Sequence, residues 1–273
     1  ADTMPMAATF SGGTWTIAAL PWGQRTVADE TLALDPDFIG EALQAISFFR
    51  GRLALIYDED CALSSASDAL AFYPATVVTQ ADDDPIFLTS TLEEKTKFLW
   101  MVNFNRRLLI AGEDAIFEVG STDGPLRAAS ATLQNVNGYD VTPRMRPFAV
   151  TARMYFSADT DVNDATGEAD TAVVFALAIN PATPNAADEA LNTATPNILK
   201  GAEVEAAVYG QDFVSVYGII GTNQLVCHVF RYAERQRIQN AFCEWELPES
   251  YTIAGVSQDG SRFFIHFPDD TGS

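Results

Sequence analysis

Residues 46–74, ISFFRGRLALIYDEDCALSSASDALAFYP, constrain the fold more than any other stretch, because they have the pattern of consecutive antiparallel strands. Leu53, Leu55 and Tyr57 alternate with the residues between them, which is the two-residue period of a half-buried strand. Three apolar runs are separated by polar turns, and Pro74, which cannot donate to a strand ladder, stops the last one: residues 52–57, 61–63 and 70–73. We therefore expect one blade of a domain built from sheets.

The rest of the chain repeats this pattern of short apolar runs separated by Gly, Asp and Asn turns. Such spacing is typical of a sandwich, a barrel or a propeller. Further strands are expected at residues 86–88, 98–102, 107–111, 115–119, 150–156, 204–209, 213–220, 225–230, 242–247, 253–256 and 263–267. The sequence thus predicts an all-β fold of short antiparallel strands with long acidic and Pro-rich loops.

Turn signals divide this chain further. Gly12 and Gly13 predict a hairpin within residues 9–17, and residues 112–114 predict a second one. Ser90 followed by Glu93, or equally Thr91 followed by Glu94, has the pattern of a capping box, which predicts a short helix.

Two stretches have the composition of loop insertions, residues 157–170 and 180–199, and the second has room for one helical turn at 186–191. The expected organisation is a leading segment with a hairpin (1–42) followed by the β body (43–273).

The net charge of −21, from 16 basic and 37 acidic residues, bounds the function. Phosphate contacts dominate affinity for nucleic acids, so this charge argues against tight DNA binding. An acidic surface suits either simple solubility or a passage through which DNA slides without adhering. No apolar run is long enough to cross a bilayer, and the opening residues lack the pattern of a secretory signal.

Residues suited to catalysis are sparse. Cys61, Cys227 and Cys243 are an odd number and favour free thiols, and their spacing with His228 does not fit zinc. Cys227 and His228 are neighbours in a predicted strand and point to opposite faces, so they make a poor nucleophile–base pair. His266 lies in another predicted strand. We expect no catalytic residue, no cofactor and no enzymatic activity.

The best metal candidate is a calcium loop that would use Asp159, Asp161, Asn163 and Asp170, at positions one, three, five and twelve. Position six is Asp164, where the calcium loop needs glycine for its sharp turn. A solvated acidic loop is therefore favoured over a metal site.

Three arginines form the one basic cluster in the sequence, around a predicted turn: Arg231, Arg235 and Arg237. They are candidates for contact with the acidic surface of a partner. The alternative is an ordinary exposed turn.

Several segments in the same order resemble the tail nozzle family (tail tubular protein B) of short-tailed bacteriophages. They are residues 4–5 (MP), 22–30 (WGQRTVADE), 36–40 (PDFIG), 48–53 (FFRGRL), 63–64 (LS), Phe72, 108–117, 138–139 (GY) and 146–148 (RPF). The strand–Trp–strand pattern around Trp245 resembles the repeating blade of that family. Ala28 departs from it, because the family usually carries glycine there, and family members are usually far longer.

The resemblance implies a β-propeller of five or six blades and a structural role in the virion. Copies, six in number, would form a ring below the adaptor ring of the tail (tail tubular protein A-like), with tail fibres as further neighbours. Phage DNA would pass through it without tight binding, and the protein would be assembled in the host cytoplasm. Acidic loop residues would then line the channel: Asp82, Asp83, Asp84, Asp164 and Glu168.

Two other classes remain open. One is a secreted β-propeller that binds or hydrolyses carbohydrate, which would need convergent carboxylates and aromatic residues in a central pocket. The other is a module of the tail that recognises the host through its exposed loops. Binding to glycans would favour either class over the nozzle.

Overall fold

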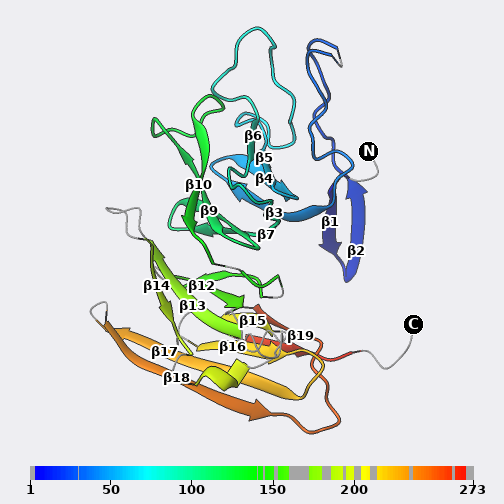
Figure 1. The fold of residues 1–273 in the computed structure, drawn as a ribbon. Coiled ribbons are helices and arrows are strands. Elements are labelled where there is room, and N and C mark those ends of the chain that lie inside the picture. Colours follow the sequence, from blue (N-terminus) through cyan, green and yellow to red (C-terminus); the bar gives the residue numbers. More distant parts are fainter. Residues whose placement is uncertain are drawn as a thin grey trace. The chain divides into compact units, whose positions relative to one another are not determined.

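The computed structural model describes residues 4–29, 31–139, 141–143, 145–150, 153–159, 172–179, 186–192, 195–199, 204–209, 214–233, 236–259 and 262–268. The chain forms two compact units, Ala1–Asn135 and Val136–Ser273. Sheets of strands that follow one another in the chain make up both units (Figure 1). The described residues contain no α-helix and one 3-10 turn, η1 (Pro196–Leu199). The prediction of an all-β fold is confirmed.

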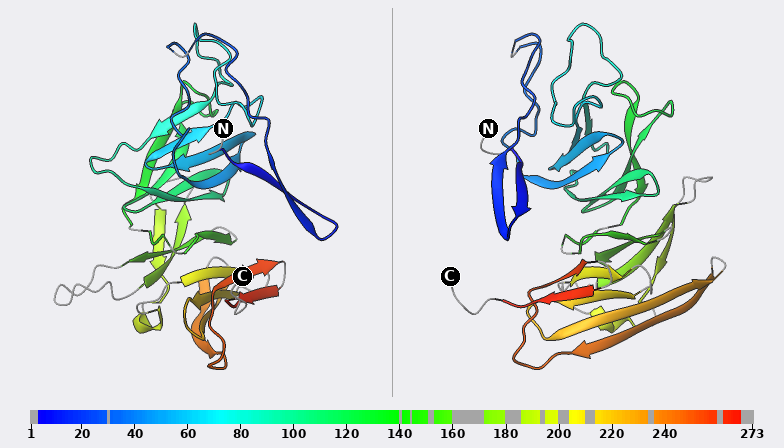
Figure 2. Two further views of the ribbon diagram at one scale, coloured as in Figure 1. Left: turned by 90° about the vertical axis from the view of Figure 1, so that its right-hand side faces the viewer. Right: turned by 180° about the vertical axis from the view of Figure 1, so that it is seen from behind.

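The first unit contains two four-stranded sheets and a separate hairpin (Figures 1 and 2). One sheet comprises β3 (Leu43–Phe49), β4 (Arg52–Tyr57), β5 (Asp60–Leu63) and β6 (Ile86–Thr89). The other comprises β7 (Phe98–Phe104), β8 (Arg107–Gly112), β9 (Ile116–Ser121) and β10 (Ala131–Asn137). The hairpin pairs β1 (Met6–Ser11) with β2 (Thr14–Ala19). Both predicted hairpins are therefore confirmed.

The core of this unit lies between the two four-stranded sheets. Ile56 and Leu63 from one sheet and Phe98 and Phe117 from the other belong to a single buried cluster. Phe98 and Phe117 meet edge to face, with ring centroids 5.3 Å apart. Burial of these apolar faces is the main force that holds the two sheets together.

The second face of strand β4 is buried as well. Leu55 and Tyr57 pack against Phe38 and Phe72, which come from the loops before and after the strands. The prediction that β4 is half-buried is therefore wrong, because loops cover the face of Leu55 and Tyr57 and the second sheet covers the face of Ala54 and Ile56.

The second unit contains two more four-stranded sheets and a short hairpin. The sheets comprise β11 (Phe148–Val150), β12 (Arg153–Asp159), β13 (Ala172–Ile179) and β14 (Ala186–Ala190), then β15 (Val204–Tyr209), β16 (Val214–Ile219), β17 (Gln224–Ala233) and β18 (Gln236–Glu246). The hairpin pairs β19 (Gly255–Asp259) with β20 (Arg262–His266). Tyr155, Tyr217 and Phe230 are fully or almost fully buried in the core of the second unit.

Three local predictions are wrong. Residues 70–73 are not a strand, because their carbonyls accept from other loops: Gly23 N–H donates to Leu70 (2.9 Å) and Ser65 N–H to Ala71 (2.8 Å). The fourth strand of that sheet is β6 instead. Residues 90–94 form no helix, and residues 186–190 form strand β14 because they pair with β13.

Each four-stranded sheet follows the chain without crossovers, which is the arrangement of a propeller blade. The closed propeller stays a prediction, because the sheets are divided between two units. In the described part of the chain, no helix is long and apolar enough to span a membrane.

Candidate acidic and basic surfaces

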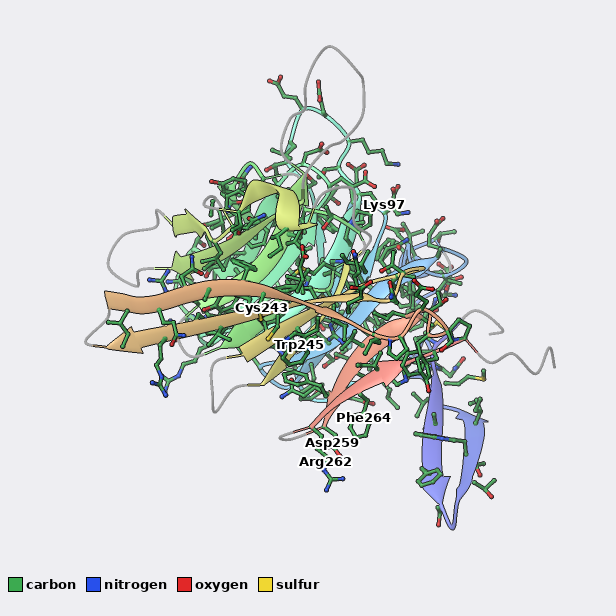
Figure 3. The ribbon with its side chains drawn as sticks, turned by 90° about the horizontal axis from the view of Figure 1, so that it is seen from below. Lys97, Cys243, Trp245, Asp259, Arg262 and Phe264 are labelled. Atoms are coloured by element: carbon green, nitrogen blue, oxygen red, sulfur yellow. The ribbon has the colours of Figure 1, made fainter. Side chains whose placement is uncertain are left out.

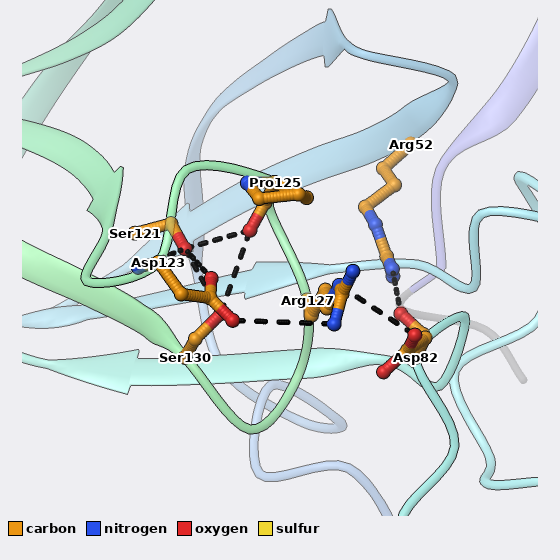
Figure 4. A network of polar contacts seen from close by, with 7 residues as sticks. All are labelled: Arg52, Asp82, Ser121, Asp123, Pro125, Arg127 and Ser130. Atoms are coloured by element: carbon orange, nitrogen blue, oxygen red, sulfur yellow. Dashed lines mark hydrogen bonds and ion pairs between the residues drawn. The ribbon is translucent and has the colours of Figure 1, made fainter.

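The acidic loop at residues 82–84 is fixed from within by Arg52 of strand β4 (Figure 4). One nitrogen of its guanidinium, Nη1, donates to the carbonyls of Ser64 (2.6 Å) and Asp84 (2.7 Å). Nη1 also lies 3.4 Å from the carbonyl of Asp83, and Nη2 donates to that of Asp82 at 3.1 Å. Arg52 thus satisfies backbone carbonyls of the loop that would otherwise be buried without a donor.

Arg52 is only 1% exposed, and its burial lowers the pKa of the guanidinium, against the opposing effect of the Asp83 and Asp84 charges. The guanidinium still stays charged at neutral pH, since arginine loses its proton only in strong base. Arg52 was not among the site residues predicted from the sequence. The sequence feature that could have identified it is an arginine inside the apolar run of a strand, where an unpaired charge is costly.

The three aspartates of this loop have different environments. Asp84 is 4% exposed, and its carboxylate accepts from the backbone N–H groups of Ala75 (3.1 Å) and Ala81 (2.7 Å). Asp82 and Asp83 are exposed. Asp84 is therefore removed from the channel-lining candidates, because its carboxylate is buried and hydrogen-bonded within the first unit.

Asp82 is partly compensated by a neighbouring arginine (Figure 4). Arg127 Nε lies 3.5 Å from a carboxylate oxygen of Asp82, and Arg127 Nη1 lies 4.0 Å from Asp123. Hydrogen bonds from Ser130 and Ser121 lower the pKa of Asp123. The surface of the loop therefore combines negative charge with one half-exposed cation, and Asp83 has no ion pair among the described residues.

The other predicted acidic residues cannot be placed. Asp161, Asn163, Asp164, Glu168 and Asp170 lie outside the described residues, and Asp159 is the last residue of β12. Across the described ranges, no group of three His, Cys, Asp or Glu residues is arranged to hold a metal ion.

The predicted basic cluster is only partly described. Arg231 is exposed on β17, opposite Gln239 of β18, and Arg237 is opposite Tyr232. Arg235 lies outside the described residues.

A second basic surface, which the sequence analysis missed, joins two turns of the first unit. Arg50 lies in the β3–β4 turn, and Arg106 and Arg107 lie at the β7–β8 turn. All three line one polar cavity of about 320 Å³. Arg107 donates to Glu118 at 2.6 Å, whereas Arg50 and Arg106 have no ion pair with any described residue. The two turns are more than fifty residues apart in sequence, so no local pattern reveals the pair.

Both turns carry backbone strain. Arg50 (φ 49°) and Arg106 (φ 66°) have left-handed conformations, which favour glycine or asparagine over arginine. These values are typical of the tight two-residue turns whose twist matches paired strands.

His228 of strand β17 is hydrogen-bonded inside the second unit. It is fully buried, its Nε2 lies 2.6 Å from Asn240 Oδ1, and its Nδ1 lies 3.4 Å from Ser215 Oγ. Asn240 in turn donates to the carbonyl of Leu191 at 3.0 Å. Ser215, whose hydroxyl lies beside this histidine, is itself fully buried.

The cysteines are free, as expected. Cys61 and Cys227 are buried, whereas Cys243 is exposed on β18 beside Trp245, which is 52% exposed (Figure 3). Cys243 alternates with Trp245 in the sequence, which predicts that the cysteine packs under the tryptophan. This prediction is wrong, because both residues are exposed on the edge strand β18.

Comparisons with known proteins agree with the resemblance noted in the sequence. The profile described as bacteriophage nozzle protein matches residues 1–272. The tail tubular protein gp12 of Escherichia phage T7 is 24% identical over 266 residues, which cover 97% of this chain and 32% of that protein. The chain therefore spans about a third of the length of this relative.

Likenesses to solved structures are weaker. A luciferin-regenerating enzyme has a TM-score of 0.44 at 7% identity, over 82% of this chain and 68% of the enzyme. PorZ, a surface component of the type-IX secretion system of Porphyromonas gingivalis, has a TM-score of 0.26 at 11% identity, over 84% and 39%. At these scores neither likeness defines the fold.

Proposed function

Because this chain belongs to the bacteriophage nozzle protein family, we propose that it is a structural part of the tail of a short-tailed phage. In this proposal, copies of the chain surround the channel through which DNA leaves the particle. The observation that carries it is the family match over residues 1–272, nearly the whole chain. The role is structural and not catalytic.

The charge of the chain supports a channel wall. With a net charge of −21, the protein repels phosphate, and the exposed carboxylates of Asp82 and Asp83 stand on a loop that Arg52 holds in place. An acidic loop held in place by Arg52 repels the phosphates of DNA, and the nearby cation Arg127 is already paired with Asp82. We place Asp82 and Asp83 on the channel side, together with Asp164 and Glu168.

The partners follow from the same proposal. Six copies form a ring that contacts the adaptor ring above it and the tail fibres beside it. Arg231, with Arg235 and Arg237, is a candidate contact for an acidic neighbour, and Arg50 and Arg106 offer a second cationic surface.

Location in the tail is the direct test. Particles of the phage that encodes this chain would be labelled with an antibody raised against the purified protein and examined by electron microscopy. We expect label at the tail tip in most particles. Label absent from intact tails and found only in lysate would overturn the proposal.

The role of the acidic loop has its own test. The double variant Asp82→Lys and Asp83→Lys changes the charge of each copy by four units without touching the buried Asp84. We expect slower genome ejection, measured by the release of DNA from particles in real time. Glu113→Lys with Asp114→Lys, at the exposed β8–β9 turn, is a matched control for charge. Equal slowing by both pairs would show an effect of net charge and not of this loop.

A further inference from the structure

The hairpin β1–β2 has one entirely apolar face. Its register pairs Met6 with Ala19, Ala8 with Ile17, and Phe10 with Trp15, so these six side chains share a face. The opposite face carries only alanine, threonine and serine: Ala7, Thr9, Ser11, Thr14, Thr16 and Ala18. Phe10 and Trp15 are in contact beside the Gly12-Gly13 turn, with ring centroids 5.1 Å apart. The hairpin is therefore amphipathic, with an aromatic pair at its tip.

This apolar face is not covered by any described part of the chain. Met6, Phe10, Trp15 and Ile17 are 62%, 58%, 66% and 65% exposed. Taking about 200 Å² for a side chain of this size, they leave roughly 500 Å² of apolar surface in contact with water. A contiguous patch of that size on a soluble protein marks an interaction site.

The hairpin also differs from the rest of the chain in charge. No residue from Met4 to Gln24 is charged, although 19% of the whole chain is. An uncharged arm can approach an acidic protein without repulsion. A membrane with anionic headgroups is a poor match, because residues 4–24 contain no basic residue and the chain as a whole is strongly acidic.

An apolar pocket of about 580 Å³ opens at the base of the hairpin. Trp22, Ile39 and Phe72 contribute to its lining, together with Met6 and Ala19 from the first residue pair of the hairpin. Ile39 is 42% exposed. The first unit thus presents an aromatic tip and an apolar pocket, and within the described residues neither fills the other.

The tip cannot enter the pocket of its own chain. Phe10 lies four residues along β1 from Met6, a distance of roughly 13 Å at 3.3 Å per residue. The paired strands hold the tip away from the base, as Figure 2 shows. Contact between tip and pocket therefore requires a second molecule.

We propose that the β1–β2 hairpin of one copy inserts Phe10 and Trp15 into the pocket beside Trp22 and Ile39 of a second copy of this chain. Two different surfaces meet in this contact, so each copy can engage one neighbour with its hairpin and another with its pocket. Such a head-to-tail contact closes into a ring when the rotation between copies permits. The inference rests on the proposed ring and assigns its contact to named residues.

Complementation between two variants tests the head-to-tail geometry. Trp15→Glu disables the tip and Ile39→Glu disables the pocket. Because both positions are exposed, neither change should affect folding, which circular dichroism would check. We expect each variant alone to self-associate roughly 30-fold more weakly than the unmodified chain, measured by analytical ultracentrifugation. An equimolar mixture should form dimers and nothing larger, because one intact tip and one intact pocket remain. Thr16→Glu, on the opposite face of the hairpin, should leave assembly unchanged.

Three results would overturn the inference. Normal assembly of Ile39→Glu would mean that hairpins pair with each other or with a different surface. A monomer at every concentration up to about 100 μM would mean that no copy occupies the pocket. Co-sedimentation of the unmodified chain, but not of Trp15→Glu, with phosphatidylglycerol vesicles would assign the face to a membrane.

A cysteine pair provides an independent readout. In a Cys243→Ser background, which removes the exposed thiol, Trp15→Cys and Ile39→Cys on separate copies should form a disulfide-linked dimer under mild oxidation. Thr16→Cys with Ile39→Cys should not. If neither pair cross-links while antibody still finds the protein in tails, the inference fails and the proposed function stands. If the pair cross-links but the tails carry no label, the contact between copies stands and the proposed function fails.

Discussion

Strands β4 and β2 are both six residues long and both carry an isoleucine on an apolar face, yet Ile56 is fully buried and Ile17 is 65% exposed. Both segments form antiparallel ladders, so strand formation alone does not explain the difference. It comes from what lies next to each strand. Strand β4 has a second sheet on one face and loops on the other, whereas no described segment covers the apolar face of the hairpin.

The comparison shows two uses of an apolar strand face. In β4 the apolar side chains stabilise the unit, since their burial contributes directly to folding. In the hairpin the same kind of side chain contributes little to the fold of one copy and remains available to a partner. Substitutions in the two regions should therefore separate stability from assembly.

The largest expected loss of stability comes from Arg52. Replacing it by methionine keeps much of its bulk but leaves the carbonyls of Ser64, Asp82 and Asp84 without their donor. We expect the free energy of unfolding to fall by about 3–5 kcal/mol, as when one partner of a buried charged contact is removed. Urea denaturation followed by fluorescence measures the change.

Arg50→Met is the matched control, since Arg50 is exposed two residues away in the same hairpin. It should change stability by less than about 0.5 kcal/mol. Equal losses in both variants would contradict the view that Arg52 holds the acidic loop.

Substitution of the two isoleucines tests the comparison between β4 and the hairpin directly. Ile56→Ala should cost about 2–5 kcal/mol, because it opens a cavity in the core between the sheets. Ile17→Ala should cost less than about 0.5 kcal/mol and weaken self-association instead. Denaturation curves and sedimentation of the same two proteins separate these outcomes. A large loss of stability in Ile17→Ala would show that the hairpin packs within its own chain.

The loops that cover β4 are expected to have a smaller effect. A Cβ at Gly23 would lie 2.9 Å from the Cα of Ala71, closer than a real contact permits. Gly23→Ala should therefore push the two covering segments apart, at a cost of about 1–3 kcal/mol. Gly120→Ala, whose new Cβ would meet only Thr132 Oγ1 at 3.5 Å, serves as the control. If the two variants have the same thermal midpoint, the cover of β4 is loose.

The smallest expected effect is a difference in reactivity between the buried and the exposed thiols, which can be measured on the unmodified chain. Burial raises the pKa of Cys61 from 9.0 to about 12 and that of Cys227 to about 11. At pH 8 both thiols stay protonated, so a disulfide reagent should modify one thiol per native chain, Cys243, and all three after unfolding. Cys243→Ser should abolish the fast reaction.

The sign of the pH effect on stability follows from the same shift. The unfolded Cys61 thiol ionises near pH 9 and the folded one near pH 12. Its contribution is therefore complete below pH 9 and is lost as the pH rises toward 12. A free energy of unfolding that increases between pH 9 and 11 would contradict this.

The sequence by itself determined the local features of this protein. The period-two runs, the Gly12-Gly13 turn and the 112–114 turn identified strands and hairpins, because those signals depend on residues within a few positions of each other. The ordered family segments from residue 4 to residue 148 identified the nozzle family. The acidic balance of the chain was also visible without a structure.

Only the tertiary structure decided what covers each surface. The fourth strand beside Cys61 is β6, some 25 residues later in the chain, and not the nearer apolar run at 70–73. Arg52 meets carbonyls that lie about 30 residues away, and Arg50 meets the Arg106 turn across more than 50 residues. A strand's pattern fixes which face is apolar, but the partner for that face is chosen by three-dimensional packing over such distances. For the same reason, an isoleucine on an apolar strand face is buried in β4 and exposed in the hairpin.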